Sequence, residues 1–105
     1  SLLSVFSKIF EKLMNKRLLS YLEKNNFFNE SQFGFRKNRS TEKAITRMTN
    51  CIFESVNENR KTVGLFIDFK KAFDLVNHTI SLQKLENVGV RGVTLDWFKS
   101  FLLNR

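Results

Sequence analysis

At 105 residues, the chain is long enough for one small domain that buries roughly 60–65% of its unfolded surface. Its 42% hydrophobic and 27% charged residues are typical of a globular protein, and the lack of a long apolar run excludes a membrane-spanning one. Cys51 has no second cysteine to pair with, which excludes an internal disulfide and suits a reducing, intracellular compartment.

The positive charge is unevenly distributed along the chain. Of the net charge of +8, residues 1–61 carry +6 (twelve basic against six acidic) and residues 62–105 carry +2 (six against four). This excess indicates either a polyanionic partner, whose phosphates attract lysine and arginine, or an ordinary solubilising surface. The first nineteen residues are charged throughout and lack a small-residue cleavage site, so we expect no signal peptide.

The first predicted element is a long amphipathic helix over residues 2–24. Its apolar residues recur at three- and four-residue steps, and lysines and glutamates fall between them. Residues 25–40 follow as an irregular segment, in which phenylalanines alternate with polar residues around Gly34.

A second helix is predicted over residues 41–57. Ser40 or Thr41 can cap its N-terminus, and Glu42 in the first turn suits the helix dipole. We expect this helix to bury one apolar stripe with Cys51 close to it, and the stripe consists of Ala44, Ile45, Met48, Ile52 and Val56. A turn at residues 57–59 then ends the helical half of the chain.

The sequence TVGLFIDF, residues 62–69, predicts a central strand with apolar residues on both faces. A lone strand is not stable, because its backbone groups need a neighbouring strand, and few are available in the chain. Helices are predicted at about residues 70–77, 79–88 and 93–103, with Gly89 as the C-cap glycine of the second of these three. The predicted fold class is therefore α+β, in a single unit.

The most informative residue for chemistry is Asp68, which ends the otherwise apolar strand. A buried carboxylate is costly unless it is paired or bound to a metal, whereas one at the end of a strand can project into a cleft as a metal ligand. The alternative is that Asp68 caps the helix that follows.

The segment around Asp68, F-I-D-F-K-K-A-F-D, resembles the first catalytic motif of reverse transcriptases, most closely those of non-LTR retrotransposons. QFGFRKNRST (32–41) resembles the fingers motif of this family, in which a glycine–aromatic–arginine turn leads into a capped helix. Residues 1–18 resemble the helix after the first fingers motif, and residues 77–105 the stretch that leads to the second catalytic motif. The resemblance covers essentially the whole chain, with the motifs in order.

The resemblance implies an incomplete polymerase domain with a mostly helical, fingers-like region (1–61) and the start of a palm (62–105). The palm would be ferredoxin-like, and residues 62–69 would be its first strand. Asp68 would bind two Mg²⁺ ions, with help from the backbone carbonyl of Phe69, for two-metal nucleotidyl transfer. Phe73 would be the steric gate that leaves no room for a ribose 2′-hydroxyl. Without the resemblance, Phe73 reads as a core residue.

The family places Arg36 near the incoming triphosphate or the template, and Lys37 and Arg39 add positive charge beside it for nucleic-acid binding. The alternative is a solvated basic loop. The implied partners are an RNA template, a DNA primer, deoxynucleoside triphosphates and the rest of the polymerase domain, with the nucleus as the place of action.

The sequence also departs from the family. Asn77 stands where aspartate is usual, Ser81 where leucine is usual and Lys43 where an acidic residue is common. The second catalytic motif, with two adjacent aspartates, lies outside the chain, so we expect this fragment to be inactive alone. A competing hypothesis is a non-catalytic relic that binds nucleic acid through its basic half and aromatic loop, in a salt-sensitive way.

Overall fold

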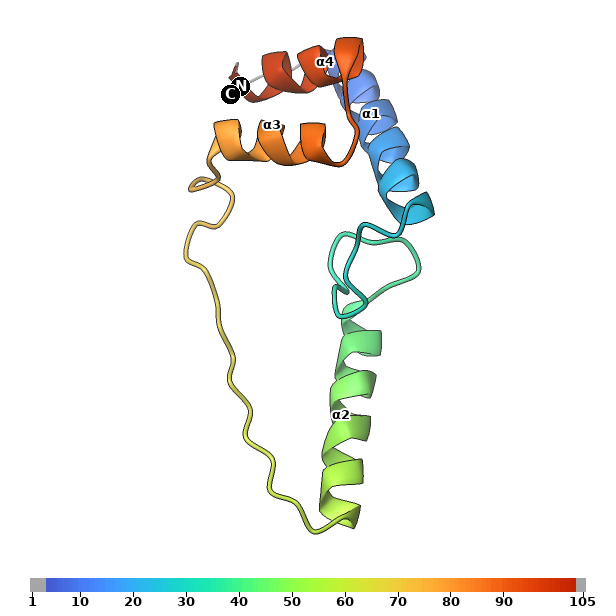
Figure 1. Ribbon diagram of the computed structural model, residues 1–105, viewed down its shortest axis with the longest axis vertical. Helices are drawn as coiled ribbons and strands as arrows, with labels where there is room; N and C mark the ends of the chain where they lie inside the picture. Colours follow the sequence, from blue (N-terminus) through green and yellow to red (C-terminus); the bar gives the residue numbers. More distant parts are fainter. Residues whose placement is uncertain (1–3, 104–105) are drawn as a thin grey trace. The chain divides into compact units, whose positions relative to one another are not determined.

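The computed structural model describes residues 4–103, and it is helical throughout its regular parts (Figure 1). Its helices are α1 (Val5–Lys24), α2 (Thr41–Asn57), α3 (His78–Asn87) and α4 (Gly92–Leu103). The chain divides into two compact units, one ending at Gly64 and the other beginning at Leu65. None of the described helices is long and apolar enough to cross a membrane.

Helix α1 confirms the helix that was predicted over residues 2–24, as far as the structure describes it. Residues 2 and 3 of that prediction lie outside the described part. Ser4 caps it, with its side chain accepting a hydrogen bond from the Ser7 backbone N–H at 3.1 Å. At the other end, Asn26 adopts a left-handed φ of 57°, and the Phe27 N–H donates to the Leu22 carbonyl at 3.0 Å. This geometry terminates the helix and turns the chain into the irregular segment that was predicted.

Helix α2 has the predicted bounds, and Ser40 is its N-cap, accepting from the Lys43 N–H at 3.2 Å. The expectation that its apolar stripe is buried is wrong for this chain. Ile45, Met48, Ile52 and Val56 are exposed, and so is Cys51. The helix is amphipathic by sequence, but a helix buries its apolar face only where another apolar element packs on it.

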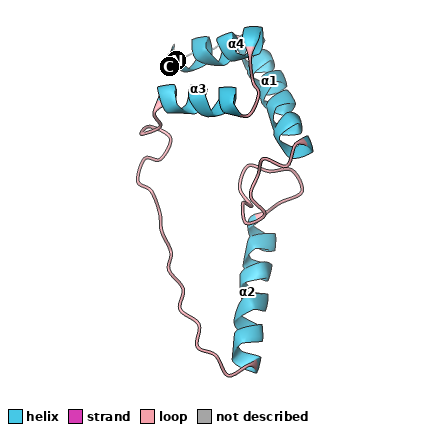
Figure 2. Cartoon of the chain, in the orientation of Figure 1, coloured by secondary structure: helices cyan, strands magenta, loops and turns pink. Residues whose placement is uncertain are grey.

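The predicted strand is the main correction to the fold. Residues 60–69 form an extended segment without strand pairing, and no strand occurs in the described part of the chain (Figure 2). The side chains there are exposed, Leu65 to 84% and Ile67 to 72%. A strand exists through hydrogen bonds to a neighbour, and no described segment provides one. The described fold is therefore α-helical and not α+β.

The short helix predicted over residues 70–77 is also wrong, because residues 70–75 form turns. Lys71 has a φ of 54°, and the N–H groups of Asp74 and Leu75 both donate to its carbonyl, at 3.1 and 3.2 Å. A left-handed residue cannot lie within a right-handed helix, so the chain turns there without continuing into one.

In the second unit, α3 and α4 form a helical hairpin and pack against each other. Asn77 caps α3 by accepting from the Ile80 N–H at 3.0 Å. Gly89, with a φ of 100°, ends α3 as predicted. The Val90 N–H donates to the Leu85 carbonyl at 3.0 Å, and Val90, 7% exposed, is the buried residue of the hairpin.

Candidate functional site

Asp68 lies in the extended segment, with an exposed side chain. The next helix after it is α3, which begins at His78 and is capped by Asn77. The alternative role of Asp68 as the cap of a following helix is therefore excluded in this structure. The residues on either side of Asp68 in the sequence are apolar and exposed, and Phe69 among them is 75% exposed.

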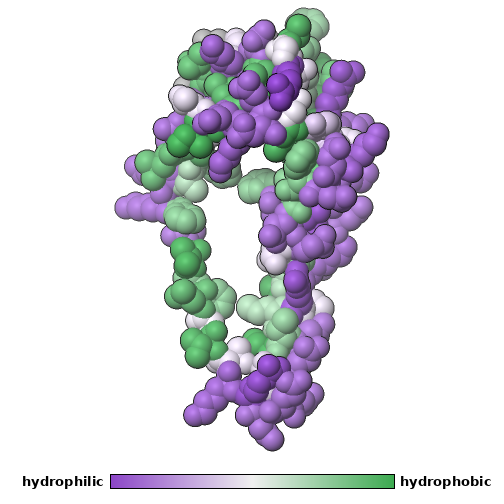
Figure 3. Space-filling model, in the orientation of Figure 1, coloured by the Kyte–Doolittle hydropathy of each residue, from purple (hydrophilic) through white to green (hydrophobic). Residues whose placement is uncertain are grey.

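Phe73 lies in the turn that follows, and the residue is 77% exposed. The reading of Phe73 as a core residue of a short helix does not hold here, because that helix is absent. Figure 3 shows apolar atoms gathered along the extended segment that precedes α3. The residues concerned are Val63, Leu65, Phe66, Ile67 and Phe69, all of them exposed.

The oxygen donors around Asp68 fit a magnesium site only in part. Mg²⁺ prefers oxygen ligands, and both the Asp68 carboxylate and the Phe69 carbonyl are of that kind. The described residues contain no cluster of three or more histidine, cysteine, aspartate or glutamate side chains that could hold a metal. Asp68 and the Phe69 carbonyl are therefore oxygen donors of the right kind, but the described residues do not gather enough side chains around them to form a metal site.

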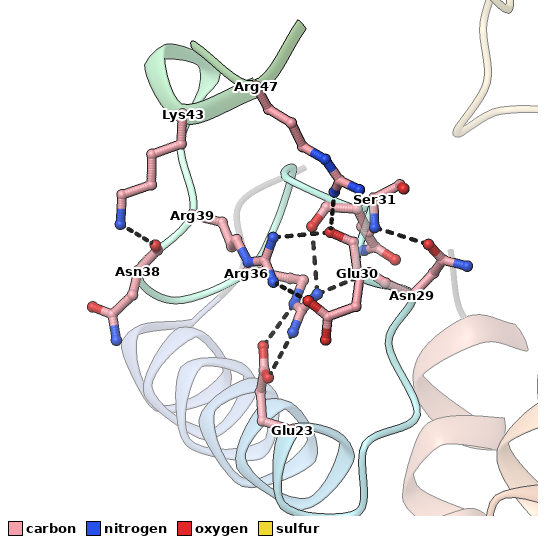
Figure 4. Close-up of polar contacts among 10 residues, drawn as sticks. Glu23, Asn29, Glu30, Ser31, Arg36, Asn38, Arg39, Lys43 and Arg47 are labelled. Atoms are coloured by element: carbon pink, nitrogen blue, oxygen red, sulfur yellow. Dashed lines mark hydrogen bonds and ion pairs between the residues drawn. The ribbon is translucent and has the colours of Figure 1, made fainter. Parts of the chain in front are cut away.

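The basic residues of the fingers-like motif lie in the loop formed by residues 25–40, in the unit that ends at Gly64. Arg36 is paired with Glu23 of α1: Nε donates to Oε1 at 2.8 Å and Nη2 to Oε2 at 3.0 Å (Figure 4). Its Nη1 donates to the Asn29 carbonyl at 2.9 Å. The guanidinium also lies over the Phe28 ring, 5.0 Å from the centroid.

Arg39 makes a second set of contacts within the same loop. It donates to both the carbonyl and the carboxylate of Glu30, at 2.9 and 3.0 Å, and lies over the Phe33 ring. Arg47 of α2 reaches the same carbonyl at 3.2 Å and the same ring. Lys37, by contrast, is exposed.

The pairing changes the acidity of Glu23. The hydrogen bond from Arg36 lowers the pKa of Glu23 below its ordinary value of 4.5, and the positive charges of Arg36 and Arg39 add to this, while desolvation opposes it. The same hydrogen bond raises the pKa of Arg36.

The structure therefore groups the predicted residues in two places. Arg36, Lys37 and Arg39 belong to the loop of the first unit, and Asp68, Phe69 and Phe73 to the second unit. Sequence reasoning missed Glu23, Phe28 and Phe33 as partners of the arginines. The only signal was the position of Glu23 in the last turn of a helix, next to the arginine-containing loop.

Comparison with known proteins identifies the family. The family model for reverse transcriptase (RNA-dependent DNA polymerase) matches residues 1–105. In Drosophila melanogaster, the probable RNA-directed DNA polymerase from transposon X-element is 37% identical over 83 residues, 79% of this chain and 9% of that protein. The corresponding protein from transposon BS is 33% identical over 88 residues, 84% of this chain and 10% of that protein.

A third relative, a putative 115 kDa protein in the type-1 retrotransposable element R1DM of the same species, is 34% identical over 104 residues, 99% of this chain and 10% of that protein. No solved structure matches the chain. The chain spans about a tenth of the length of these curated relatives. This chain belongs to the reverse transcriptase family, and the relatives described above are products of transposable elements, two of them named as probable RNA-directed DNA polymerases.

Proposed function

We propose that the polymerase containing this chain copies RNA into DNA by two-metal nucleotidyl transfer, and that Asp68 is one of its metal-binding carboxylates. The observation that carries the proposal is the position of Asp68 in F-I-D-F-K-K-A-F-D, within a family match that covers the whole chain. The exposed carboxylate, which caps no helix, supports it.

Each residue of the segment has a separate task in this proposal. The Asp68 carboxylate and the Phe69 carbonyl are the oxygen ligands for the metal, at the end of the apolar segment. When bound, two Mg²⁺ ions supply activation of the attacking hydroxyl and neutralisation of charge on the leaving pyrophosphate. The Phe73 ring lies beneath the sugar of the incoming nucleotide and excludes a 2′-hydroxyl by contact.

The extended segment becomes the first strand of a ferredoxin-like palm when the rest of the domain supplies its neighbours. The alternation of Val63, Leu65 and Ile67 and their exposure in this chain support this proposal. A strand without its neighbouring strand has unpaired backbone groups and uncovered apolar side chains. The division into fingers-like residues 1–61 and palm residues 62–105 is proposed with it.

The remaining partners follow from the same proposal. Lys37 and Arg39 contribute positive charge toward an RNA template and a DNA primer, and deoxynucleoside triphosphates are the substrates. The polymerase acts in the nucleus, on chromosomal DNA. The chain has no adjacent pair of aspartates, so we expect no polymerisation from these residues alone.

The decisive experiment is Asp68→Ala in a polymerase that contains this chain and the rest of its domain. Loss of a metal ligand is expected to reduce Mg²⁺-dependent incorporation of deoxynucleotides on an RNA template by at least about 100-fold. The matched control is Asp96→Ala in α4, which removes an equal charge from the same unit and should leave the rate within about twofold. Undiminished activity of the Asp68 variant would overturn the assignment.

Phe73→Ala tests the sugar gate separately. Removal of the ring opens the space beneath the sugar, so the preference for deoxyribonucleotides over ribonucleotides is expected to fall by at least about tenfold. The measurement is kcat/KM for each nucleotide of a matched pair, and Phe53→Ala, which removes an exposed ring from α2, outside the proposed palm segment, is the control. Unchanged sugar selection in Phe73→Ala would remove the gate from the proposal.

A further inference from the structure

Arg36 is anchored to α1 through both oxygens of one carboxylate. The side chain of Arg36 is 9% exposed and that of Glu23 35%, and the two N–H···O contacts at 2.8 and 3.0 Å make a bidentate pair. A pair of this geometry fixes direction as well as distance, because the planar guanidinium and the carboxylate must face each other. The residues lie thirteen positions apart, so the pair fastens the loop to the end of the helix.

The guanidinium has little capacity left for another ligand. Of its five N–H groups, two donate to Glu23 and a third to the Asn29 carbonyl at 2.9 Å, and Nη1 makes a longer contact to the Gln32 carbonyl at 3.5 Å. One face is covered by the Phe28 ring. A phosphate that bound Arg36 through two parallel N–H groups would have to displace the Glu23 carboxylate or a loop carbonyl group.

A loop has no regular backbone hydrogen bonds of the kind found in helices and sheets, and in this loop hydrogen bonds from side chains to backbone carbonyl groups take their place. Between the two helices, carbonyl groups of the loop accept from charged side chains, with Arg39 and Arg47 on Glu30 and Lys43 on Asn38 at 2.6 Å (Figure 4). These contacts favour one conformation of the loop, since Arg36 joins acceptors of α1 and of two loop residues, and Lys43 and Arg47 connect the loop to α2.

The residue before Arg36 is held in a costly conformation. Phe35 has a φ of 58°. A left-handed conformation is unfavourable for an aromatic residue and persists only where its surroundings impose it. The Phe35 ring is 80% exposed, and Lys37 on the other side of Arg36 is also exposed. The anchored arginine thus fixes an exposed aromatic ring and an exposed cation on either side of itself.

We propose that Glu23 and Arg36 are a positioning pair, which fixes the loop of residues 25–40 so that Phe35 and Lys37 meet the RNA template strand in one arrangement. Arg36 acts through the loop and does not contact the phosphates of the nucleotide. The proposal replaces the expected nucleotide contact of Arg36 and rests on the proposed function. Aromatic rings and cations side by side suit an unpaired strand, which offers bases to stack and phosphates to neutralise.

The test is a double-mutant cycle with Glu23→Gln, Arg36→Gln and the double variant, in a polymerase containing this chain. The Kd for an RNA template annealed to a DNA primer is measured by fluorescence anisotropy, which needs no catalysis. Each single variant is expected to raise this Kd about 3- to 10-fold, and the double variant no more than either single one, because all three remove the same pair. At saturating template–primer, the KM for the deoxynucleotide and kcat should change by less than about twofold.

Control variants separate the effect of losing the Glu23–Arg36 pair from the effects of a changed net charge and of impaired folding. Arg17→Gln in α1 and Glu54→Gln in α2 change the charge equally at exposed positions and correct for the loss or gain of one charge. Glu23→Asp retains the charge but is one methylene too short for the bidentate geometry, so it should resemble Glu23→Gln. Arg36→Lys is expected to be as impaired as Arg36→Gln, because lysine cannot form the fork.

Other outcomes overturn the proposal. If Arg36→Lys and Glu23→Gln keep normal template binding while Arg36→Gln raises the nucleotide KM, Arg36 contacts the triphosphate directly, since lysine also binds phosphate. Additive effects in the cycle would show that the two residues act separately. If the wild-type polymerase incorporates no nucleotide, the proposed function fails, while the anisotropy cycle still decides the role of the pair.

Discussion

Arg36 and Asp68 are both charged residues that the sequence assigns to contacts with substrate, but their surroundings differ. Arg36 lies among acceptors from its own loop and from α1, and Asp68 is exposed on a segment without regular structure. The hydrogen bonds of Arg36 within the protein support its proposed positioning role, and the exposure of the Asp68 carboxylate supports its proposed role as a metal ligand. The two residues therefore enter the proposed polymerase reaction in different ways.

The Glu23–Arg36 pair is expected to respond to pH in a defined direction. Because the pKa of Glu23 is lowered on folding, chiefly by the hydrogen bond from Arg36, the ionised form is favoured in the folded chain. The contribution to stability is complete above the ordinary value of 4.5 and is lost as the pH falls through the lowered value. Arg36 stays protonated over this pH range, so it does not contribute to the change of stability with pH.

An NMR titration from about pH 6 to about pH 3 checks this, with the Arg36 Nε–H signal as the reporter. The signal is expected to shift with a midpoint below 4.5, and the shift should be absent in Glu23→Gln. A midpoint at or above 4.5 would show that the pair does not favour the carboxylate.

At the scale of the elements, helices α1, α2 and α3 end by one shared geometry. After α1, α2 and α3 the chain passes through a left-handed residue, which is Asn26, Asn59 or Gly89, with φ of 57°, 56° and 100°. In each case a later N–H donates back to a carbonyl in the last turn. Asparagine and glycine are the residues that tolerate this conformation, so the helix ends follow from local sequence.

Gly89→Ala tests this geometry in the α3–α4 hairpin. A Cβ at a left-handed position is expected to lower the free energy of unfolding of the hairpin by about 1–2 kcal/mol. Hydrogen exchange of the α3 amides measures this change. Gly34→Ala is the control, because a Cβ there meets no atom within 4 Å, and its effect should stay within about 0.5 kcal/mol. Equal stability of the two variants would contradict the cap assignment.

The predictions for the segment between α2 and α3 failed for a related reason. Alternation of apolar residues over 62–69 indicates a strand, but a strand also requires a partner, and the described residues supply none. The helix predicted over 70–77 is absent because Lys71 has a left-handed conformation, and a lysine in the sequence does not indicate that conformation. Both errors concern elements whose existence depends on more than the local pattern.

For the whole chain, burial is slight and charge is high. Val90 is the buried hydrophobic residue of the described part, and apolar side chains on α2 and on residues 63–75 are exposed. With a net charge of +8, the chain has a loop that contains several basic residues and a separate segment of exposed apolar residues, which the proposed function assigns to nucleic acid and to the rest of the polymerase domain. Both fit the family to which the chain belongs.

The sequence by itself determined the family, the approximate positions of the four described helices, and Ser40 and Gly89 as caps of α2 and α3. Helical hydrogen bonds and caps join residues within a few positions of each other, so periodicity and residue type suffice to predict them. The partner of Arg36, the absence of a strand at 62–69 and the exposure of the α2 stripe were decided only by the tertiary structure. Each of these depends on which distant segment lies nearby, and no local pattern carries that information.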